Sequence, residues 1–206
     1  MTSRKGERST YNGQFYIGMQ QTRYYRQMAA YLIREATVAD AEAIARVHVA
    51  SWRETYRGLI DDAIIDSRTI ERRTIQWTGA LADRERSTFV ACAKEAMCGF
   101  ASAVVGEPSK PETCGDLQTL YVLRAAQGAG IGKALLQAAA EKLSLRGCTA
   151  LRLHVLPNNS AARGFYEHLG AQYVGDLVAT DNGDEWVDAV YEWKDLASLA
   201  AHEANK

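Results

Sequence analysis

The fold of this chain is decided by one stretch, Leu120-Tyr121-Val122-Leu123-Arg124-Ala125-Ala126-Gln127-Gly128-Ala129-Gly130-Ile131-Gly132-Lys133-Ala134-Leu135-Leu136. Its beginning is typical of a β-strand, its glycine-rich middle of a turn, and its end of an amphipathic helix. The first amides of a helix have no partner within the helix, and the helix dipole adds partial positive charge there. Because glycines let the backbone come close to an anion, the stretch predicts a phosphate-binding turn.

The glycine spacing excludes two nucleotide-binding loops. A dinucleotide-binding turn has the pattern G-x-G-x-x-G, which the glycines at 128, 130 and 132 do not match. A Walker loop has the pattern G-x-x-x-x-G-K-[ST], but Lys133 is followed by Ala134, which offers no hydroxyl for magnesium. The pattern that fits is Q-x-x-G-x-G, formed by Gln127, Gly130 and Gly132. Taken alone, this turn could still be an ordinary strand-to-helix connection.

A second motif follows further along the chain, where Asn159, Ala162, Tyr166 and Gly170 form N-x-x-A-x-x-x-Y-x-x-x-G. The two motifs, in this order, resemble those of the GNAT superfamily of acyl-CoA-dependent N-acetyltransferases, and the resemblance covers residues 31–196. It implies the α/β GNAT fold, a mixed and mostly antiparallel sheet of six to seven strands. Helices flank this sheet, and its strands splay at the centre.

The resemblance also implies where acetyl-CoA, the acyl donor, is held. Main-chain amides after the central strand would bind its diphosphate, and the amide of Val122 would face the thioester carbonyl. No metal is expected. The predicted cofactor-binding residues are Leu120, Tyr121, Val122, Gln127, Gly128, Ala129, Gly130, Ile131, Gly132, Lys133, Asn159 and Ala162.

Acyl transfer to an amine needs a proton donor for the leaving thiolate and a proton acceptor for the amine. Tyr166 is the predicted donor, because a phenol of pKa about 10 is protonated at neutral pH and can donate to a thiolate of pKa about 8.5. The resemblance implies that a strand carboxylate acts as the base through water, and Asp116 is the residue predicted to fill this place; a chain of water molecules could also suffice. Glu192 is the alternative strand carboxylate, and Asp188 and His154 come after these two.

The predicted reaction is direct attack by a primary amine of a small molecule or peptide on acetyl-CoA within a ternary complex. The alternative is a non-catalytic module of the same fold that binds or senses acyl-CoA. Trp52, Arg53, Glu54 and Tyr56 are predicted substrate contacts, because this early helical region covers the acceptor site in GNAT proteins. These aromatic rings could instead be core or lid packing, and the charges a solvated face. His48 is interpreted as a partly buried histidine rather than a ligand.

Composition limits the partners and the location. The chain has 206 residues, 47% hydrophobic and 24% charged, which is typical of one globular domain. With 24 basic and 25 acidic residues, it shows no sign of a nucleic-acid surface. No apolar run approaches the roughly 20 residues that cross a bilayer. The four cysteines form no C-x-x-C pair, which favours a reducing, cytoplasmic location without zinc or disulfides. A homodimer is left open.

Residues 1–30 are predicted to be an N-terminal extension, residues 31–196 the acetyltransferase domain, and residues 197–206 a frayed tail. Part of the extension could pack as a helix, because Tyr24 and Met28 recur at helical spacing. The predicted elements are a strand at 32–36, helices at 37–58 and 61–82, strands at 87–93 and 97–105, a strand at 116–123, a helix at 130–146, a strand at 150–156, a helix at 159–169, and strands at 172–179 and 186–193.

Strict alternation is expected along the central strand. It would place Leu117 and Tyr121 on one face, and Leu120 and Val122 on the other.

Overall fold

The structure, a computed structural model, describes residues 25–28, 30–94, 96–106, 114–181 and 184–201. Its strands are β1 (Tyr25–Met28), β2 (Tyr31–Glu35), β3 (Arg86–Ala93), β4 (Ala96–Val105), β5 (Cys114–Val122), β6 (Ala150–Val155), β7 (Gln172–Asp181) and β8 (Asp184–Trp193). Its helices are η1 (Val38–Asp40), α1 (Ala41–Tyr56), α2 (Asp62–Asp66), α3 (Ile70–Ala82), η2 (Arg124–Ala126), α4 (Ile131–Leu145), α5 (Ser160–His168) and α6 (Leu196–Ala201). None of these helices is long and apolar enough to cross a membrane.

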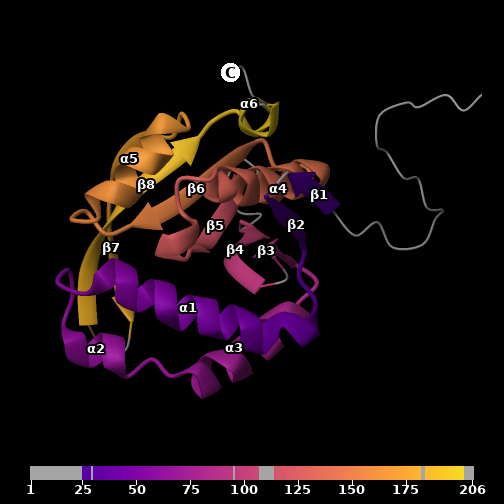
Figure 1. The fold of residues 1–206 in the computed structure, drawn as a ribbon. Coiled ribbons are helices and arrows are strands. Elements are labelled where there is room, and N and C mark those ends of the chain that lie inside the picture. The colour runs from indigo at the N-terminus through magenta and orange to yellow at the C-terminus, as the bar shows by residue number, and fades with distance from the viewer. Residues whose placement is uncertain (1–24, 29, 95, 107–113, 182–183, 202–206) are drawn as a thin grey trace, which may run out of the picture.

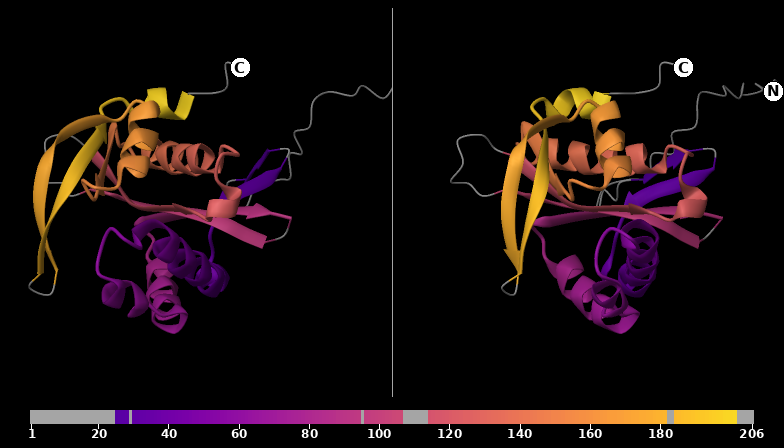
Figure 2. Two further views of the ribbon diagram at one scale, coloured as in Figure 1. Left: turned by 60° about the vertical axis from the view of Figure 1, so that its left-hand side comes forward. Right: turned by 90° about the vertical axis from the view of Figure 1, so that its left-hand side faces the viewer.

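The strands form one mixed sheet in the order β1-β2-β3-β4-β5-β6-β8-β7 (Figure 1). Only β5 and β6 run parallel, and every other neighbouring pair of described strands is antiparallel. Helices α1 to α3 cover one face, and α4 to α6 lie on the other side (Figure 2). The predicted mixed, mostly antiparallel α/β fold is therefore confirmed.

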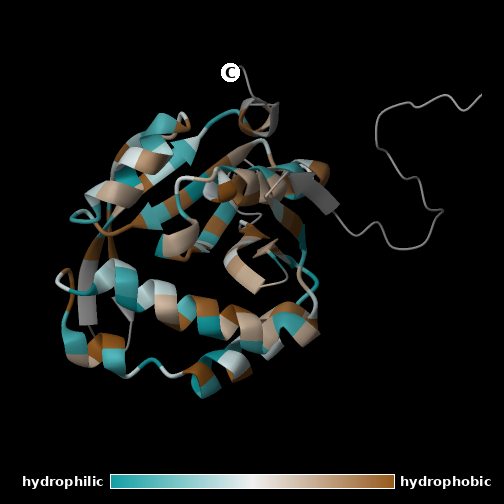
Figure 3. Ribbon diagram, viewed as in Figure 1, coloured by the Kyte–Doolittle hydropathy of each residue, from teal (hydrophilic) through white to brown (hydrophobic). Residues whose placement is uncertain are grey.

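A hydrophobic cluster lies on each face of the sheet. The larger packs α4 against the strands, with Leu135 and Leu151 fully buried. The smaller packs α1 and α3 against the opposite face, around Ile44 and Phe100. Figure 3 shows apolar and hydrophilic residues mixed along α1 and α5, as expected for helices with one face buried.

The N-terminal part differs from the prediction. Residues 25–28 form a strand rather than a helix, and they pair with β2 from Tyr25 opposite Arg34 to Met28 opposite Tyr31. The described sheet therefore has eight strands, one more than predicted. Residues 1–24 of the predicted extension lie outside the described residues.

The C-terminal part differs as well. Leu196 and Leu199 of α6 are buried in the larger cluster, and Gln137 of α4 donates a hydrogen bond to the carbonyl oxygen of Leu199 at 3.4 Å. The segment predicted as a frayed tail thus begins with a helix that belongs to the core. Residues 202–206 lie outside the described residues.

A β-bulge interrupts the alternation of β5. The register against β4 slips at Gln118, which has no residue opposite it in β4. The bulge adds one residue to the strand, so the side chains beyond it point to the face opposite to the one that strict alternation predicts. Leu117 and Leu120 therefore both pack with the cluster on the α4 face, whereas Tyr121 packs with α1 and α3. The prediction that Leu117 and Tyr121 share one face is therefore wrong.

Beyond the bulge, β5 and β6 separate. Their parallel pairing among the described residues ends with Leu117 opposite Leu153, whereas β6 remains paired with β8 as far as Val155. We call this separation, between residues 118–122 of β5 and residues 154–155 of β6, the strand fork. It confirms the predicted splay, and it leaves the end of β5 with a strand neighbour only on the β4 side.

Candidate active site

Two glycines with left-handed backbone conformation form part of the turn after β5. Gly128 and Gly130 have φ angles of +78° and +79°, in the left-handed region that favours glycine. Gly130 caps α4, and its carbonyl oxygen accepts the amide of Ala134 at 3.0 Å. The amides of residues 128–133 have no hydrogen-bond acceptor among the described residues. At the positive end of a helix, such amides fit a phosphate group.

Hydrogen bonds fix this turn to the end of β5. The side chain of Gln127 donates to the carbonyl oxygen of Val122 at 3.0 Å, and the amide of Leu123 donates to the carbonyl oxygen of Cys98 in β4 at 2.9 Å. In an antiparallel pair such bonds alternate along the strand. The amide of Val122 therefore points away from β4 and toward the strand fork, the orientation that its predicted role requires.

Tyr166 of α5 is only 8% exposed, and its ring packs edge-on against Phe165 and Trp193. Burial raises the pKa of its hydroxyl above the usual range, and the neighbouring Tyr56 raises it further. Its hydroxyl has no hydrogen-bond partner among the described residues. Tyr166 is therefore a protonated donor at neutral pH, which is the state that its predicted role needs.

Asn159 and Gly132, predicted cofactor-binding residues from the two motifs, also have structural roles. Asn159 caps α5, because its side-chain oxygen accepts the amide of Ala162 at 3.2 Å. A Cβ at Gly132 would lie 3.1 Å from the ring of Phe165, so this glycine lets α5 approach the start of α4. Asn159 keeps its side-chain NH2 group to donate to a ligand, whereas Gly132 has a steric reason to be glycine that is independent of phosphate.

Asp116, the predicted base, does not reach the strand fork. It lies opposite Arg152 in the paired part of β5. It also precedes Val122 by six positions, which at about 3.3 Å per residue is roughly 20 Å along the strand. Glu192, the alternative, is buried and accepts a hydrogen bond from Arg152 at 2.7 Å. Asp116 is therefore remote from the turn, and the carboxylate of Glu192 is already bound to Arg152.

Asp188 of β8 is the carboxylate that lies level with the strand fork. Its position follows from the pairing of Val155 with Ala189, which places Asp188 beside the end of β6. Its carboxylate oxygen lies 3.9 Å from Nδ1 of His154, and its side chain is 15% exposed. The pairing of β6 with β8 is long-range, so the sequence offers only the alternation of positions 188, 190 and 192 as a signal for this face.

Trp52 and Tyr56 are on the side of α1 that faces β5. Their ring centroids are 4.2 Å apart, and the Tyr56 hydroxyl oxygen lies 3.3 Å from that of Tyr121. Burial raises the pKa of Tyr56 and that of Tyr121. Both phenols are therefore protonated at neutral pH, close to the amide of Val122.

His48, one turn earlier on α1, is a core residue, as predicted. It is buried, and its Nδ1 accepts a hydrogen bond from Nε1 of Trp77 at 3.1 Å. Burial, followed by the charges of Arg73 and Arg68, lowers the pKa of His48 to about 3. The imidazole is therefore neutral and acts as a hydrogen-bond acceptor within the core.

The predicted contacts Arg53 and Glu54 lie elsewhere on α1. The Glu54 carboxylate accepts the amide of Arg124 at 2.8 Å, and the Arg124 guanidinium donates to the Glu54 carbonyl oxygen, also at 2.8 Å. These bonds join the end of α1 to the turn after β5. Arg53 and Glu54 also line a hollow of about 450 Å³, together with Arg57 and Asp66.

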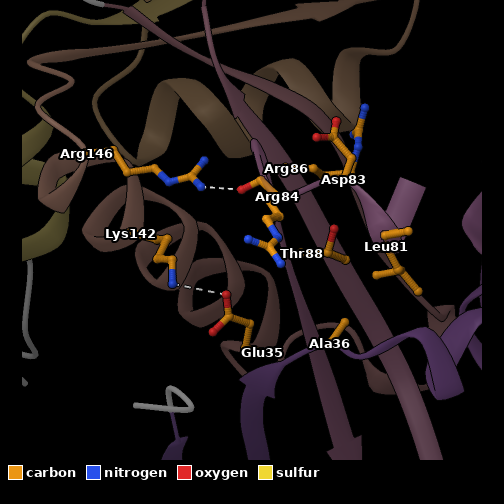
Figure 4. A pocket seen from close by; sticks show the side chains of 10 residues that line it. Glu35, Ala36, Leu81, Asp83, Arg84, Arg86, Thr88, Lys142 and Arg146 are labelled. Atoms are coloured by element: carbon orange, nitrogen blue, oxygen red, sulfur yellow. Dashed lines mark hydrogen bonds and ion pairs between the residues drawn. The ribbon is translucent and has the colours of Figure 1, made fainter. Parts of the chain in front are cut away.

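A second hollow of about 240 Å³ lies between the end of α4, the end of β2 and the start of β3 (Figure 4). Two of its basic side chains are bound within the protein. Lys142 lies 3.1 Å from the Glu35 carboxylate, and Arg146 donates to the carbonyl oxygens of Arg84 and Glu85. These contacts join α4 to β2 and to the residues just before β3, at the end of the helix opposite the turn.

The fold and the site define a class of protein: an α/β protein whose central strand ends in an amide-lined turn beside a strand fork. The chain belongs to the GNAT acetyltransferase family, because residues 26–171 match the model described as "Acetyltransferase (GNAT) family". It is an N-acetyltransferase of that family.

Known proteins agree with this assignment. The uncharacterized N-acetyltransferase YuaI of Bacillus subtilis (strain 168) is 31% identical over 172 residues, which cover 81% of this chain and 95% of that protein. Aminoglycoside N(6')-acetyltransferase type 1 of Stenotrophomonas maltophilia is 34% identical over 126 residues, covering 58% and 71% of the two chains. The crystal structure of PaiA N-acetyltransferase from Thermoplasma acidophilum with coenzyme A has a TM-score of 0.63 and 23% identity, covering 79% of this chain and 98% of that one.

Proposed function

We propose that this chain transfers an acetyl group from acetyl-CoA to a primary amine of a small molecule or peptide, by direct attack within a ternary complex. The observation that carries this proposal is the turn of residues 128–133. Its amides have no acceptor among the described residues, and they lie at the positive end of α4 beside the strand fork. The coenzyme A in the PaiA structure supports the same cosubstrate. When bound, acetyl-CoA supplies an acyl group activated as a thioester.

Different residues of the chain would bind the cosubstrate and transfer the protons. The turn amides would hold the diphosphate, and the Val122 amide would donate to a carbonyl oxygen in the strand fork. Tyr166 would donate its proton to the sulfur as the C–S bond breaks. For the proton that the amine loses, the geometry favours Asp188 over Asp116. The cytoplasmic location, the homodimer and the domain limits stay predictions from the sequence.

The test is thiol release from acetyl-CoA with a panel of amines. Tyr166→Phe should lower kcat by about a hundredfold or more, because it removes the proton donor, while binding of coenzyme A stays within about twofold. Tyr173→Phe is the matched control, since Tyr173 is exposed on β7. Tight binding of coenzyme A without thiol release on any amine would instead support the non-catalytic binding module.

A further inference from the structure

Two guanidinium groups converge on Trp52 from outside α1. The central guanidinium carbon of Arg68, which follows α2, lies 4.3 Å from the Trp52 ring centroid, and that of Arg73 in α3 lies 5.9 Å from it. No described carboxylate lies within ion-pair distance of either guanidinium. The guanidinium of Arg73 donates a hydrogen bond to the side-chain oxygen of Gln76, a neutral group, at 2.9 Å. The cluster therefore holds two half-buried positive charges without a counter-charge among the described residues.

The same cluster contains two buried donors that lack acceptors. The Nε of Arg68 and the Nε1 of Trp52 are both shielded from solvent and have no hydrogen-bond partner among the described residues. By contrast, the indole of the nearby Trp77 donates to His48. A buried donor without an acceptor is unfavourable and needs an explanation. The Arg68 guanidinium, which includes one of these donors, the Arg73 guanidinium and the Trp52 N–H together form the complement of an anion.

A carboxylate also acts on Tyr56. Burial is the main cause that raises the pKa of Tyr56. The charge of Asp188 raises this pKa further, whereas the charge of Arg68 lowers it. Tyr56 is therefore within electrostatic range of both a carboxylate and a guanidinium. Its hydroxyl is also 3.3 Å from that of Tyr121, the residue before Val122. Positive and negative groups thus both act on Tyr56, which contacts the end of β5.

We propose that the acceptor is an amine that also carries a carboxylate, such as an amino acid, and that Arg68, Arg73 and Trp52 bind this carboxylate. Its ammonium group would lie toward Tyr56 and Asp188, on the side of the strand fork. This proposal rests on the function proposed above. A polycationic acceptor such as an aminoglycoside would meet two unpaired guanidinium groups at this place, and repulsion would disfavour it.

The first test compares acceptors that differ only in the anionic group. Methionine, phenylalanine and lysine would each be compared with the corresponding amide by thiol release from acetyl-CoA. For at least one pair, the free carboxylate should give a kcat/KM about tenfold higher or more, since charge-assisted hydrogen bonds are lost in the amide. Arg68→Gln should abolish this preference by raising KM for the carboxylate alone. Arg72→Gln, on the exposed side of α3, is the matched control and should keep the preference.

The second test measures binding without turnover. Calorimetry on the protein with coenzyme A would compare N-acetyl-methionine and N-acetyl-phenylalanine with their amides. The acids should bind more tightly, and Trp52→Phe, which keeps an aromatic ring but removes the N–H donor, should reduce this difference. Thermal unfolding of each variant shows whether it is folded.

The outcomes separate the two proposals. If amines are acetylated but acids and amides behave alike, or if Arg68→Gln keeps the preference, the carboxylate site is refuted and the acetyltransferase function stands. If no amine is acetylated but N-acetyl acids bind in an Arg68-dependent manner, the site stands and the proposed function fails. If neither thiol release nor selective binding occurs, both proposals fail.

Discussion

Among single residues, His48 should make the stability of the protein depend on pH. Its pKa is about 3 in the folded protein, against 6.5 for an ordinary histidine, with burial as the main cause. Between these values the unfolded chain binds a proton that the folded chain does not, so the free energy of unfolding falls as the pH falls. The loss should approach about 1.4 kcal/mol per pH unit below pH 6.5. Urea unfolding at several pH values between about 7 and 5 measures it.

His48→Asn is the informative variant, because the Asn side-chain oxygen can accept the Trp77 N–H in place of Nδ1 but does not titrate. We expect the stability of this variant to be nearly independent of pH in the same window. His168→Asn, which alters an exposed histidine of α5, should keep the pH dependence of the original chain. An equal slope in all three proteins would show that His48 is not responsible.

At the scale of an element, α4 has left-handed glycines at both ends, and only one of them lies in the proposed phosphate turn. Gly130 and Gly147 have φ angles of +79° and +87°, so Gly130→Val and Gly147→Val should both strain the backbone and lower stability. Only Gly130→Val should also block close approach of the diphosphate. We expect it to weaken coenzyme A binding about thirtyfold or more, about 2 kcal/mol, with Gly147→Val within about twofold.

Isothermal titration of folded Gly130→Val and Gly147→Val with coenzyme A measures this difference. Normal binding by Gly130→Val would remove the turn from the site, whatever the stability of the variant.

Helix α6 allows a second comparison between matched leucines. Leu199 is buried against α4, whereas Leu145, at the end of α4, is 86% exposed. Leu199→Ala should lower the free energy of unfolding by about 2–5 kcal/mol, and Leu145→Ala by less than about 0.5 kcal/mol. Chemical denaturation measures both values. A neutral Leu199→Ala would support the frayed tail that the sequence predicts.

For the molecule as a whole, we expect that the position of a carboxylate relative to the strand fork determines whether it can serve as the base. Asp188→Asn should lower kcat by about a hundredfold, because it removes the proposed proton acceptor beside the fork. Asp116→Asn should leave kcat within about threefold, because Asp116 lies roughly 20 Å back along β5. Initial rates at saturating acceptor, normalised to folded protein, compare the two variants. The opposite ranking would restore Asp116 as the base.

The motif residues could be placed from sequence because their signals are local. The Q-x-x-G-x-G turn, the start of α4 and the helix that carries Tyr166 each depend on neighbours within a few positions, where spacing and glycine conformation decide the structure. The faces of β5 could not be placed, because the bulge at Gln118 arises from its pairing with β4. Likewise, the proximity of Asp188 to His154 depends on the pairing of β6 with β8.

Local signals were sufficient to predict the order of most strands and helices, the turn that we propose binds phosphate and the candidate proton donor Tyr166, because each depends on local periodicity, glycine conformation or ordinary side-chain chemistry. The strand at residues 25–28, the burial of helix α6, the separation of β5 from β6 and the side chains that meet there all depend on long-range contacts, so they became visible in the structure alone. The physical reason is that long-range pairing and burial bring Arg68, Trp52 and Asp188 into one region. The spacing of these three residues along the sequence does not show that they act in the same region.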